Sequence, residues 1–520
     1  MSSSFTNVDL DNPSPPRWPE RVTSIVMSLA VLGYLILPGI WQWSTAATEA
    51  AKTKNVVAQV TPIIPPTSDT GLANQLRTAP TSLQASPIIL TYHDVGYRHN
   101  QYSVTPEVFA GQMQLLADAG WTTITAAQLS DWLTGHPLPP HAVMITFDDG
   151  VRGVWRYADP ILARNHQHAS AYIITGFVGT NAPYYMTWQE ITALQSSGRW
   201  DIEAHTHLGH VQIPTGPAGK QGPFLTNLQY LASESRVETV DEYRKRITQD
   251  LIECKKQIIA RRLPEPTFFA YPFSAQAGTP ALTEILTTTV KSLFHGAMLD
   301  DAGTARTTTA SELVDGNLER MDITSDVSVA DWAAKLFNAS PLDPPTAAPF
   351  TRTTDWTTND GAPATLPIHD QALALDPGPG HYTIRKFAPA QTSIWHSYSV
   401  TATLGGFRRA GDGTTSGLVV LSDDAQQIEL TLSDGSFQTR QGLDANERIL
   451  AAGTLPLASA YPVEITVRPD SVAIRISGRL IRSIPLRPNG TYSPAGGIAI
   501  AGKRENIDSP IPQISNIAVH

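Results

Sequence analysis

Between residues 85 and 337, short apolar runs alternate with longer amphipathic segments, and this alternation limits the fold more than any other feature. The apolar runs predict strands at 87–91, 142–146, 169–174, 201–204 and 267–270. A helix is expected to start at Thr105, and a longer one covers 241–262. Strands that alternate with helices are typical of βαβ units and a mostly parallel sheet. About 250 residues of this pattern suit a closed α/β barrel.

From residue 368 onward the pattern changes to a period of two. Alternating runs lie at 397–404, 427–432, 463–467 and 471–476, separated by turns such as Ser433-Asp434-Gly435. Such runs predict an all-β antiparallel sandwich. The segment 338–367 is rich in Pro and Thr and predicts a linker. We therefore expect a barrel domain at 85–337 and a β-sandwich at 368–520.

The N-terminal part contains an uncharged segment from Val22 to Trp43. About twenty apolar or small residues can cross ~30 Å of hydrocarbon. We expect a transmembrane helix at 22–43, a cytoplasmic tail at 1–21 and a linker at 44–84. The alternatives for this segment are a signal peptide cut near 44–47 and a buried helix. A transmembrane helix would place the rest of the chain outside the cytoplasm, in the periplasm or at the cell surface. A cleaved signal peptide would make the rest of the chain a secreted protein.

Charge and cysteine content exclude several classes of protein. The net charge of −10 argues against nucleic-acid binding, which needs clustered Lys and Arg. The single cysteine, Cys254, excludes a disulfide framework and a cysteine-based zinc finger. Any metal site must therefore be built from His, Asp and Glu.

Polar side chains of the kinds that bind metals or transfer protons follow several of the predicted strands. They are Tyr92-His93-Asp94, Asp148-Asp149-Gly150, His205-Thr206-His207 with His210, and Tyr271-Pro272-Phe273. In a parallel α/β barrel the carboxyl ends of the strands open on one face, where active sites form. Taken singly, an Asp-Asp-Gly is commonly a turn and a His-rich loop is commonly surface. Together at the strand ends they favour a functional site.

Adjacent carboxylates on an extended chain point in opposite directions. One of Asp148 and Asp149 can then bind a metal while the other stays free as a base. His205, His210 and Asp149 would make a two-His, one-carboxylate site with open positions for water and substrate. His207 could replace one of the two histidines.

These motifs resemble a known family. Thr146-Phe147-Asp148-Asp149-Gly150 resembles the first signature of the NodB-homology polysaccharide deacetylases, carbohydrate esterase family four. The run from His205 to His210 resembles their His-Ser/Thr…His motif. Its five-residue spacing, with the early Tyr92-His93-Asp94, is similar to the branch that deacetylates poly-β-1,6-N-acetylglucosamine. Tyr271-Pro272-Phe273 resembles the segment that lines the acetyl pocket in that family.

The resemblance implies a distorted (β/α) barrel of the NodB type that hydrolyses the N-acetyl groups of an exopolysaccharide. By this resemblance a divalent metal, zinc by default with other first-row ions possible, binds Asp149, His205 and His210. Asp148 would act as general base and His93 as general acid, with Asp94 orienting His93. Tyr271, Pro272 and Phe273 would contact the substrate, and a backbone N–H near Phe273 would stabilise the oxyanion.

The chain also departs from the family pattern. Val151 stands where Tyr usually follows the first signature, and Ser274 stands where Gly is common. The Arg that often steadies the base is missing before Tyr271. The C-terminal half resembles the concanavalin-A-like or laminin-G-like jelly rolls, which implies either glycan binding or a spacer.

Other functions share some of these features. One is a catalytically inactive, glycan-binding scaffold. Another is a deacetylase of chitin, peptidoglycan or an O-acetylated polysaccharide, which would use the same residues. A glycoside hydrolase needs two carboxylates spaced across a sugar, and the adjacent Asp148 and Asp149 do not meet that requirement.

Overall fold

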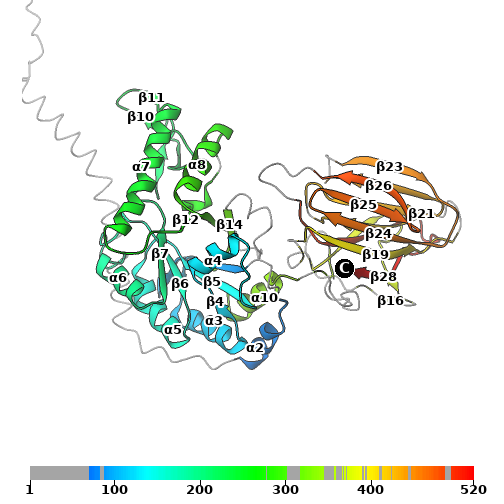
Figure 1. Ribbon diagram of the computed structural model, residues 1–520, viewed down its shortest axis with the longest axis horizontal. Helices are drawn as coiled ribbons and strands as arrows, with labels where there is room; N and C mark the ends of the chain where they lie inside the picture. The colour runs from blue at the N-terminus through cyan, green and yellow to red at the C-terminus, as the bar shows by residue number, and fades with distance from the viewer. Residues whose placement is uncertain are drawn as a thin grey trace, which may run out of the picture.

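A computed structural model describes residues 69–81, 87–276, 278–300 and 317–342 of the N-terminal part (Figure 1). In the C-terminal part it describes 356–358, 372–388, 395–408, 413–422, 424–442, 447–486 and 494–520, with a few single positions between them. The predicted tail at 1–21 and membrane span at 22–43 lie outside the described residues. Within the described ranges, no helix is both long and apolar enough to span a bilayer.

Seven parallel strands close into a barrel in the order β1-β14-β13-β12-β7-β6-β5, and β5 pairs back to β1. A short strand, β4, pairs with the start of β5. The bounds are β1 (Ile88–Tyr92), β4 (Thr122–Thr123), β5 (Ala142–Phe147), β6 (Ala169–Ile173), β7 (Trp200–Ala204), β12 (Phe268–Ala270), β13 (Gly296–Asp300) and β14 (Asn317–Asp322). The predicted closed parallel barrel is confirmed.

Helices connect successive strands and cover the outside of the barrel (Figure 1). They are α2 (Thr70–Arg77), α3 (Pro106–Ala119), α4 (Ala126–Leu133), the π-helical turn η1 (Val154–Ala158), α5 (Asp159–Arg164), α6 (Trp188–Ser196), α7 (Val240–Ile259), α8 (Pro280–Leu293) and α10 (Val329–Ala339). Capping residues fix where several of these helices begin. The Thr105 side chain caps α3 ahead of Pro106, and Thr239 and Glu242 form a capping box at the start of α7.

Side-chain alternation along the strands divides the domain core in two. Leu90 and Ile145 belong to a cluster that includes the buried faces of α3 and α7. Their neighbours Ile89 and Met144 belong to a separate cluster with Phe268 and Trp132. Because successive side chains on a strand point to opposite faces, the second cluster fills the inside of the barrel.

Short strand pairs in the connecting loops complete this domain. They are β2 (Asp94–Val95) with β3 (Ser103–Val104), β8 (Gln212–Pro214) with β9 (Gln221–Pro223), and β10 (Tyr230–Leu231) with β11 (Arg236–Val237). A 3-10 turn, η2 (Pro272–Ser274), follows β12.

The structure starts this domain earlier than predicted. Helix α2 lies within the expected linker at 44–84, is capped by Asp69, and buries Leu76 completely. The carbonyl of Leu76 accepts a hydrogen bond from Trp121 Nε1 at 3.2 Å. Leu72 and Leu76 stand four residues apart on one face of this helix, and both pack against the barrel core. This spacing is short, and the Ala-, Thr- and Pro-rich composition around it predicted a tether instead.

The C-terminal part consists of two seven-stranded sheets. One contains β15 (Trp356–Thr357), β18 (Tyr382–Phe387), β27 (Ile498–Arg504), β20 (Thr414–Val420), β21 (Ile428–Ser433), β22 (Ser436–Gln441) and β23 (Arg448–Thr454). The other contains β16 (Ile368–His369), β17 (Ala372–Ala374), β28 (Gln513–Val519), β19 (Tyr398–Gly405), β24 (Ala460–Arg468), β25 (Ser471–Ile476) and β26 (Arg479–Pro485).

Both sheets contribute to one apolar core, with Leu418 and Ile428 from the first and Val400 and Ile465 from the second. All pairings between the named strands of this part are antiparallel. Trp356 is fully buried in this core, so part of the predicted linker at 338–367 belongs to the sandwich. The all-β architecture is confirmed, whereas the jelly-roll resemblance stays a prediction.

Candidate active site

The barrel brings the predicted site residues to one end. His93 follows β1, Asp148 and Asp149 follow β5, and His205 follows β7. Tyr92 pairs with Phe147 in the parallel register, so His93 and Asp148 leave neighbouring strands at the same level. His205 is fixed by its Nδ1, which lies 2.9 Å from the carbonyl oxygen of Ala270 on β12. The parallel topology therefore explains why the predicted site residues lie together at one end of the barrel.

Asp149, His205 and His210 form a compact group whose ligand atoms all lie within 4.8 Å of one another. Asp149 Oδ1 lies 3.5 Å from His205 Nε2 and 3.4 Å from His210 Nε2. Among the described residues this buried oxygen has no hydrogen-bond partner. A tetrahedral metal with bonds of about 2.1 Å separates two of its ligand atoms by about 3.4 Å. The spacing of the three residues therefore fits a divalent metal better than it fits hydrogen bonds.

The backbone at Asp149 explains how both carboxylates reach the site. Asp149 has a left-handed φ of 71° and Gly150 has a φ of 76°. The chain is thus not extended here, and the side chains of Asp148 and Asp149 do not diverge as they would on a strand. The different roles expected for the two carboxylates therefore stay a prediction, and the reason given for them, an extended backbone, is wrong.

Charges around this group act on its pKa values. Burial raises the pKa of Asp149, but the neighbouring imidazoles of His205, His210 and His93 outweigh burial and hold it well below its usual range. Burial lowers the pKa of His205, but the Asp148 and Asp149 carboxylates outweigh burial and raise it. The pKa of His210 is lowered, mainly by burial and then by His205. A neutral His210 keeps its ring nitrogen free to bind a metal.

The loop that carries His210 is held by Asp250 of α7. The Asp250 carboxylate accepts hydrogen bonds from the backbone N–H of His207 at 3.0 Å and of Leu208 at 2.7 Å. At Gly209 a side chain would meet Phe224 at 3.0 Å and Asp250 at 3.1 Å. The loop is therefore closely packed at its turn, which brings His210 back toward His205.

His207 does not belong to the metal group. Its Nδ1 lies 3.0 Å from Thr175 Oγ1, and neither of the two groups of metal-binding geometry among the described residues, Asp149-His205-His210 and His93-Asp148-Asp300, contains it. The alternative in which His207 replaces a ligand is therefore not supported by the geometry.

Asp148 is held by a residue that the sequence did not reveal. Arg320 of β14 donates from Nη1 to Asp148 Oδ1 at 2.8 Å and from Nη2 to Oδ2 at 2.6 Å. Both side chains are almost completely buried. Burial raises the pKa of Asp148, but the Arg320 charge and hydrogen bonds lower it below its usual range. Asp148 is therefore ionised at neutral pH and fixed in direction, as a proton acceptor must be.

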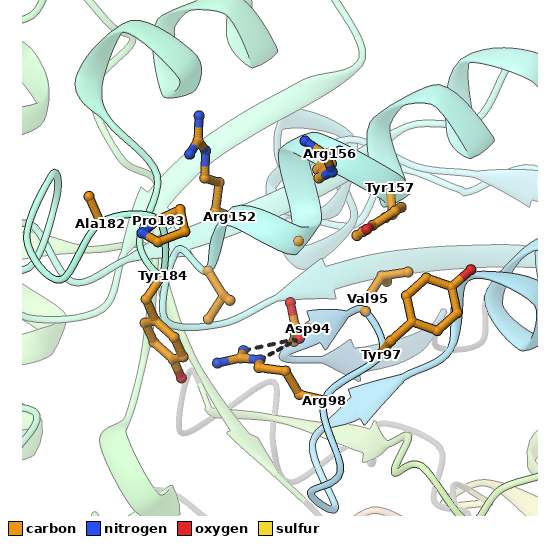
Figure 2. A pocket seen from close by; sticks show the side chains of 13 residues that line it. Asp94, Val95, Tyr97, Arg98, Arg152, Arg156, Tyr157, Ala182, Pro183 and Tyr184 are labelled. Carbon is orange, nitrogen blue, oxygen red and sulfur yellow. Dashed lines mark hydrogen bonds and ion pairs between the residues drawn. The ribbon is translucent and has the colours of Figure 1, made fainter. Parts of the chain in front are cut away.

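His93 has a different acidic neighbour from the one expected. Asp322 Oδ1 lies 3.9 Å from His93 Nδ1, and the His93 ring packs on Tyr102 at 4.8 Å between centroids. Asp94 is turned away: its Oδ2 accepts hydrogen bonds from Ser103 at 2.7 Å and from Arg98 Nε at 3.2 Å (Figure 2). Because Asp94 starts β2, its side chain points opposite to that of His93. The prediction that Asp94 orients His93 is therefore wrong, and Asp322 is the carboxylate that lies nearest to His93 Nδ1, at a distance longer than a hydrogen bond.

The aromatic segment after β12 contributes one residue to the site. Phe273 is 48% exposed, and its ring centroid lies 4.4 Å from that of His210. Tyr271 is buried and packs against Phe269 at 5.1 Å in the layer under the helices. Strand alternation assigns Tyr271 to the outer layer, and Pro272 is buried as well. Of the three residues expected to contact substrate, Phe273 is the one placed to do so.

Sequence comparisons agree with this site. Residues 135–286 match the family model described as polysaccharide deacetylase. The matched range includes Asp148, Asp149, His205 and His210, whereas His93 and Arg320 lie outside it.

Curated relatives carry related names. The chain is 27% identical over 190 residues to a poly-β-1,6-N-acetyl-D-glucosamine N-deacetylase of Escherichia coli K12, covering 34% of this chain and 28% of that protein. It is 27% identical over 136 residues to the Staphylococcus epidermidis protein of the same name, covering 26% of this chain and 46% of that protein. The chain thus spans less than half the length of these relatives.

A solved structure is also similar: the BpsB deacetylase domain from Bordetella bronchiseptica, at 20% identity and a TM-score of 0.40, covering 47% of this chain and 97% of that one. Residues 135–286 of the barrel are therefore similar to the polysaccharide deacetylase family, and the two curated relatives are named as N-deacetylases.

Proposed function

We propose that this protein is a metal-dependent polysaccharide N-deacetylase that removes acetyl groups from N-acetylglucosamine units of a poly-β-1,6-linked exopolysaccharide. The observation that carries the proposal is the placement of the Asp149, His205 and His210 group beside the Arg320-bound Asp148. Two curated relatives are named for this substrate. The products would be acetate and glucosamine units in the polymer.

Asp149, His205 and His210 would hold the metal, with zinc the default for two imidazoles and a carboxylate. A divalent metal there would activate a water and polarise the acetyl carbonyl. Asp148, ionised and oriented by Arg320, would take the proton from the attacking water. His93, with Asp322 behind it, would give a proton to the departing sugar amine.

The proposal includes an extracytoplasmic location. The uncharged segment from Val22 to Trp43 supports attachment to the membrane by an N-terminal helix, or secretion if that segment is cleaved. The C-terminal sandwich is proposed to hold the polymer near the barrel, on the ground of its lectin-like sequence pattern. The substrate, location and role of the sandwich are all parts of the proposal.

The test is acetate release by the full-length protein in detergent. The substrates are β-1,6-linked and β-1,4-linked N-acetylglucosamine hexamers and an O-acetylated polysaccharide. We expect the β-1,6 hexamer to be the best substrate and His210→Gln to abolish release. His207→Gln is the matched control, because His207 lies in the same loop but outside the metal group. Release from the β-1,4 hexamer alone would replace the proposed polymer with a chitin-like one.

A further inference from the structure

The two sheets of the sandwich leave an open edge on one side. Strands β23 and β26 are the last described strands of their sheets, and Figure 1 shows them next to each other. A cavity of about 530 Å³ lies between the sheets here, lined by residues of both, among them Gly453 of β23 and Ile481 of β26. We use the term open edge for β23, β26, this cavity and the loop 455–459 that joins β23 to β24.

The cavity of the open edge is mainly apolar. Its larger apolar side chains are Phe437, Leu455, Ile476, Leu480 and Ile481. Tyr461 adds only its ring, because its hydroxyl donates to the Pro456 carbonyl at 2.7 Å and accepts from the Gly435 N–H at 3.0 Å. The lining residues include no carboxylate, and Arg479 is the one charged residue among them.

Exposed apolar side chains are concentrated along the open edge. Ile449 on β23 is 62% exposed, Leu457 in the loop is 70% exposed, and Leu480 on β26 is 52% exposed. Among the described residues of the sandwich, the other large apolar side chains that are exposed are Tyr382 and Ile507. Single exposed leucines are common, but three such residues along one edge, beside an apolar cavity, form a patch that fits an interaction site.

The same edge is positively charged in an acidic chain. Residues 471–486 include three arginines and no acidic residue, whereas the whole chain has a net charge of −10. Arg475 stands opposite Glu464 in the β24–β25 ladder, so its charge is balanced in part. Arg479 and Arg482 are exposed on the edge strand, and the ion pairs between described residues of the sandwich involve neither of them.

This combination of side chains fits an anionic lipid surface better than it fits other partners. Guanidinium groups bind phosphates, and exposed aliphatic side chains enter the boundary between headgroups and acyl chains. A sugar polymer would press its hydroxyl groups against the leucines, which is unfavourable for groups that lose hydrogen bonds to water. A second copy of the chain, paired edge to edge, would bring like charges together.

We propose that the open edge docks on an anionic phospholipid membrane. Leu457 and Leu480 enter the acyl boundary, while Arg479 and Arg482 bind headgroup phosphates. The apolar cavity behind them gives part of a lipid chain room between the sheets. This contact is independent of the proposed deacetylation, and it adds to any attachment through the segment 22–43.

The first test measures whether the two leucines reach lipid. The full-length protein is reconstituted into vesicles, with bimane attached at Leu457→Cys or Leu480→Cys. The native Cys254 is completely buried and is not labelled. Quenching by doxyl-labelled lipids is expected to be about threefold stronger in phosphatidylglycerol-rich vesicles than in phosphatidylcholine vesicles. Ile507→Cys is the matched control, because Ile507 is 68% exposed but follows β27, four strands from β23.

The second test assigns the role of charge. Each arginine removed near an anionic surface weakens binding about fivefold. The combined Arg479→Gln and Arg482→Gln variant should therefore reduce quenching at Leu457→Cys to the level in phosphatidylcholine, and high salt should have the same effect. Arg468→Gln is the matched control and should leave quenching unchanged, because Arg468 is exposed at the end of β24 opposite to Ala460, which lines the cavity.

Three results would overturn the proposal. Absence of quenching at both leucine positions would exclude membrane docking, and equal quenching in both kinds of vesicle would exclude a role for the arginines. A bimane response to the N-acetylglucosamine hexamer without lipid, or dimers in detergent that the paired arginine substitutions change, would assign the edge to a glycan or to a second copy. Acetate release is not part of the readout, so a failure of the proposed function would leave this test intact.

Discussion

Arg320 and Asp148 stand 172 residues apart in the chain and form a buried two-point ion pair at 2.8 and 2.6 Å. The same Arg320 Nη2 lies 2.7 Å from Asp300 Oδ1. Strands β14 and β5 both pair with β1, so closure of the barrel brings these two residues together. The ion pair thus stabilises the closed barrel and also sets the orientation and ionisation of Asp148, the candidate base.

Removing Arg320 should therefore affect both stability and activity. Loss of one partner of a buried ion pair costs about 3–5 kcal/mol, so Arg320→Met is expected to lower the free energy of unfolding by about this amount in urea titrations. Arg320→Lys keeps the charge but loses the planar fork, and should lose less stability. Arg244→Met, at an exposed arginine of α7, should leave stability within about 0.5 kcal/mol.

The same substitution predicts a change in pH dependence. Arg320 lowers the pKa of Asp148 against the opposing effect of burial. Without the arginine, the pKa of Asp148 rises, and the base becomes protonated at a higher pH. The acid limb of the kcat/KM profile should therefore move to higher pH in Arg320→Met, and by less in Arg320→Lys, which keeps the positive charge. An unmoved limb would show that Asp148 is not the group whose ionisation limits the rate.

The loss of activity on removing His93 should depend on whether the leaving group must be protonated as it departs. A general acid contributes about 10²–10⁴-fold, so His93→Gln is expected to lose that much activity on the sugar amide. p-Nitrophenolate leaves without a proton, and the rate on p-nitrophenyl acetate should fall much less. Equal losses on both substrates would assign His93 to another role.

Asp250 should act through the loop that carries His210. Its carboxylate accepts two backbone N–H groups of that loop, and groups that position metal ligands typically affect affinity 10–100-fold. Asp250→Ala is expected to weaken zinc binding by about this factor, measured by competition with a chelating dye. Asp241→Ala, at an exposed acid in the first turn of the same helix, is the control and should bind zinc normally.

The sandwich contains a buried acid whose effect on stability depends on pH. Glu429 is 7% exposed, and burial raises its pKa above the ordinary value. A raised carboxyl pKa means that the folded state holds the proton more tightly, so stability falls as pH rises above the unfolded-state pKa of about 4.3. Glu429→Gln should therefore raise the melting temperature of the sandwich at pH 7, and the gain should vanish near pH 4.

A melting temperature that is equally raised at both pH values would point to packing and not to ionisation. Glu464→Gln is a suitable control, because Glu464 lies on β24, in the other sheet of the same sandwich, and its side chain is only partly buried.

Much of the barrel and the metal group could be predicted from the sequence because the signals are local. The runs before His93 and Asp148 are short and apolar, the run before His205 alternates apolar residues with two acids, and each of these three residues stands directly after its strand. Parallel topology then brings strand ends together wherever the strands lie in the sequence. The five-residue spacing of His205 and His210 carried further information, because a turn can close over that distance.

The residues that were missed lie on a polar strand. In β14, Asn-Leu-Glu-Arg-Met-Asp, the two apolar residues stand three apart among four polar ones, so the run lacks the period of a strand. The signal available is that Arg320 and Asp322 stand at the end of this run, a few residues before helix α10. The errors at Tyr271 and Asp94 had one cause, since the side to which each residue points depends on strand register that the sequence does not specify.

The central claim is that a metal held by Asp149, His205 and His210 is needed for deacetylation. The most direct measurement is a titration of zinc into metal-free, full-length enzyme while acetate release from the β-1,6-linked hexamer is followed. Activity is expected to rise linearly to a plateau at about one equivalent of zinc, and Asp149→Asn is expected to show no rise. Full activity in the metal-free protein, or a saturated metal site without acetate release from any acetylated polymer, would contradict it.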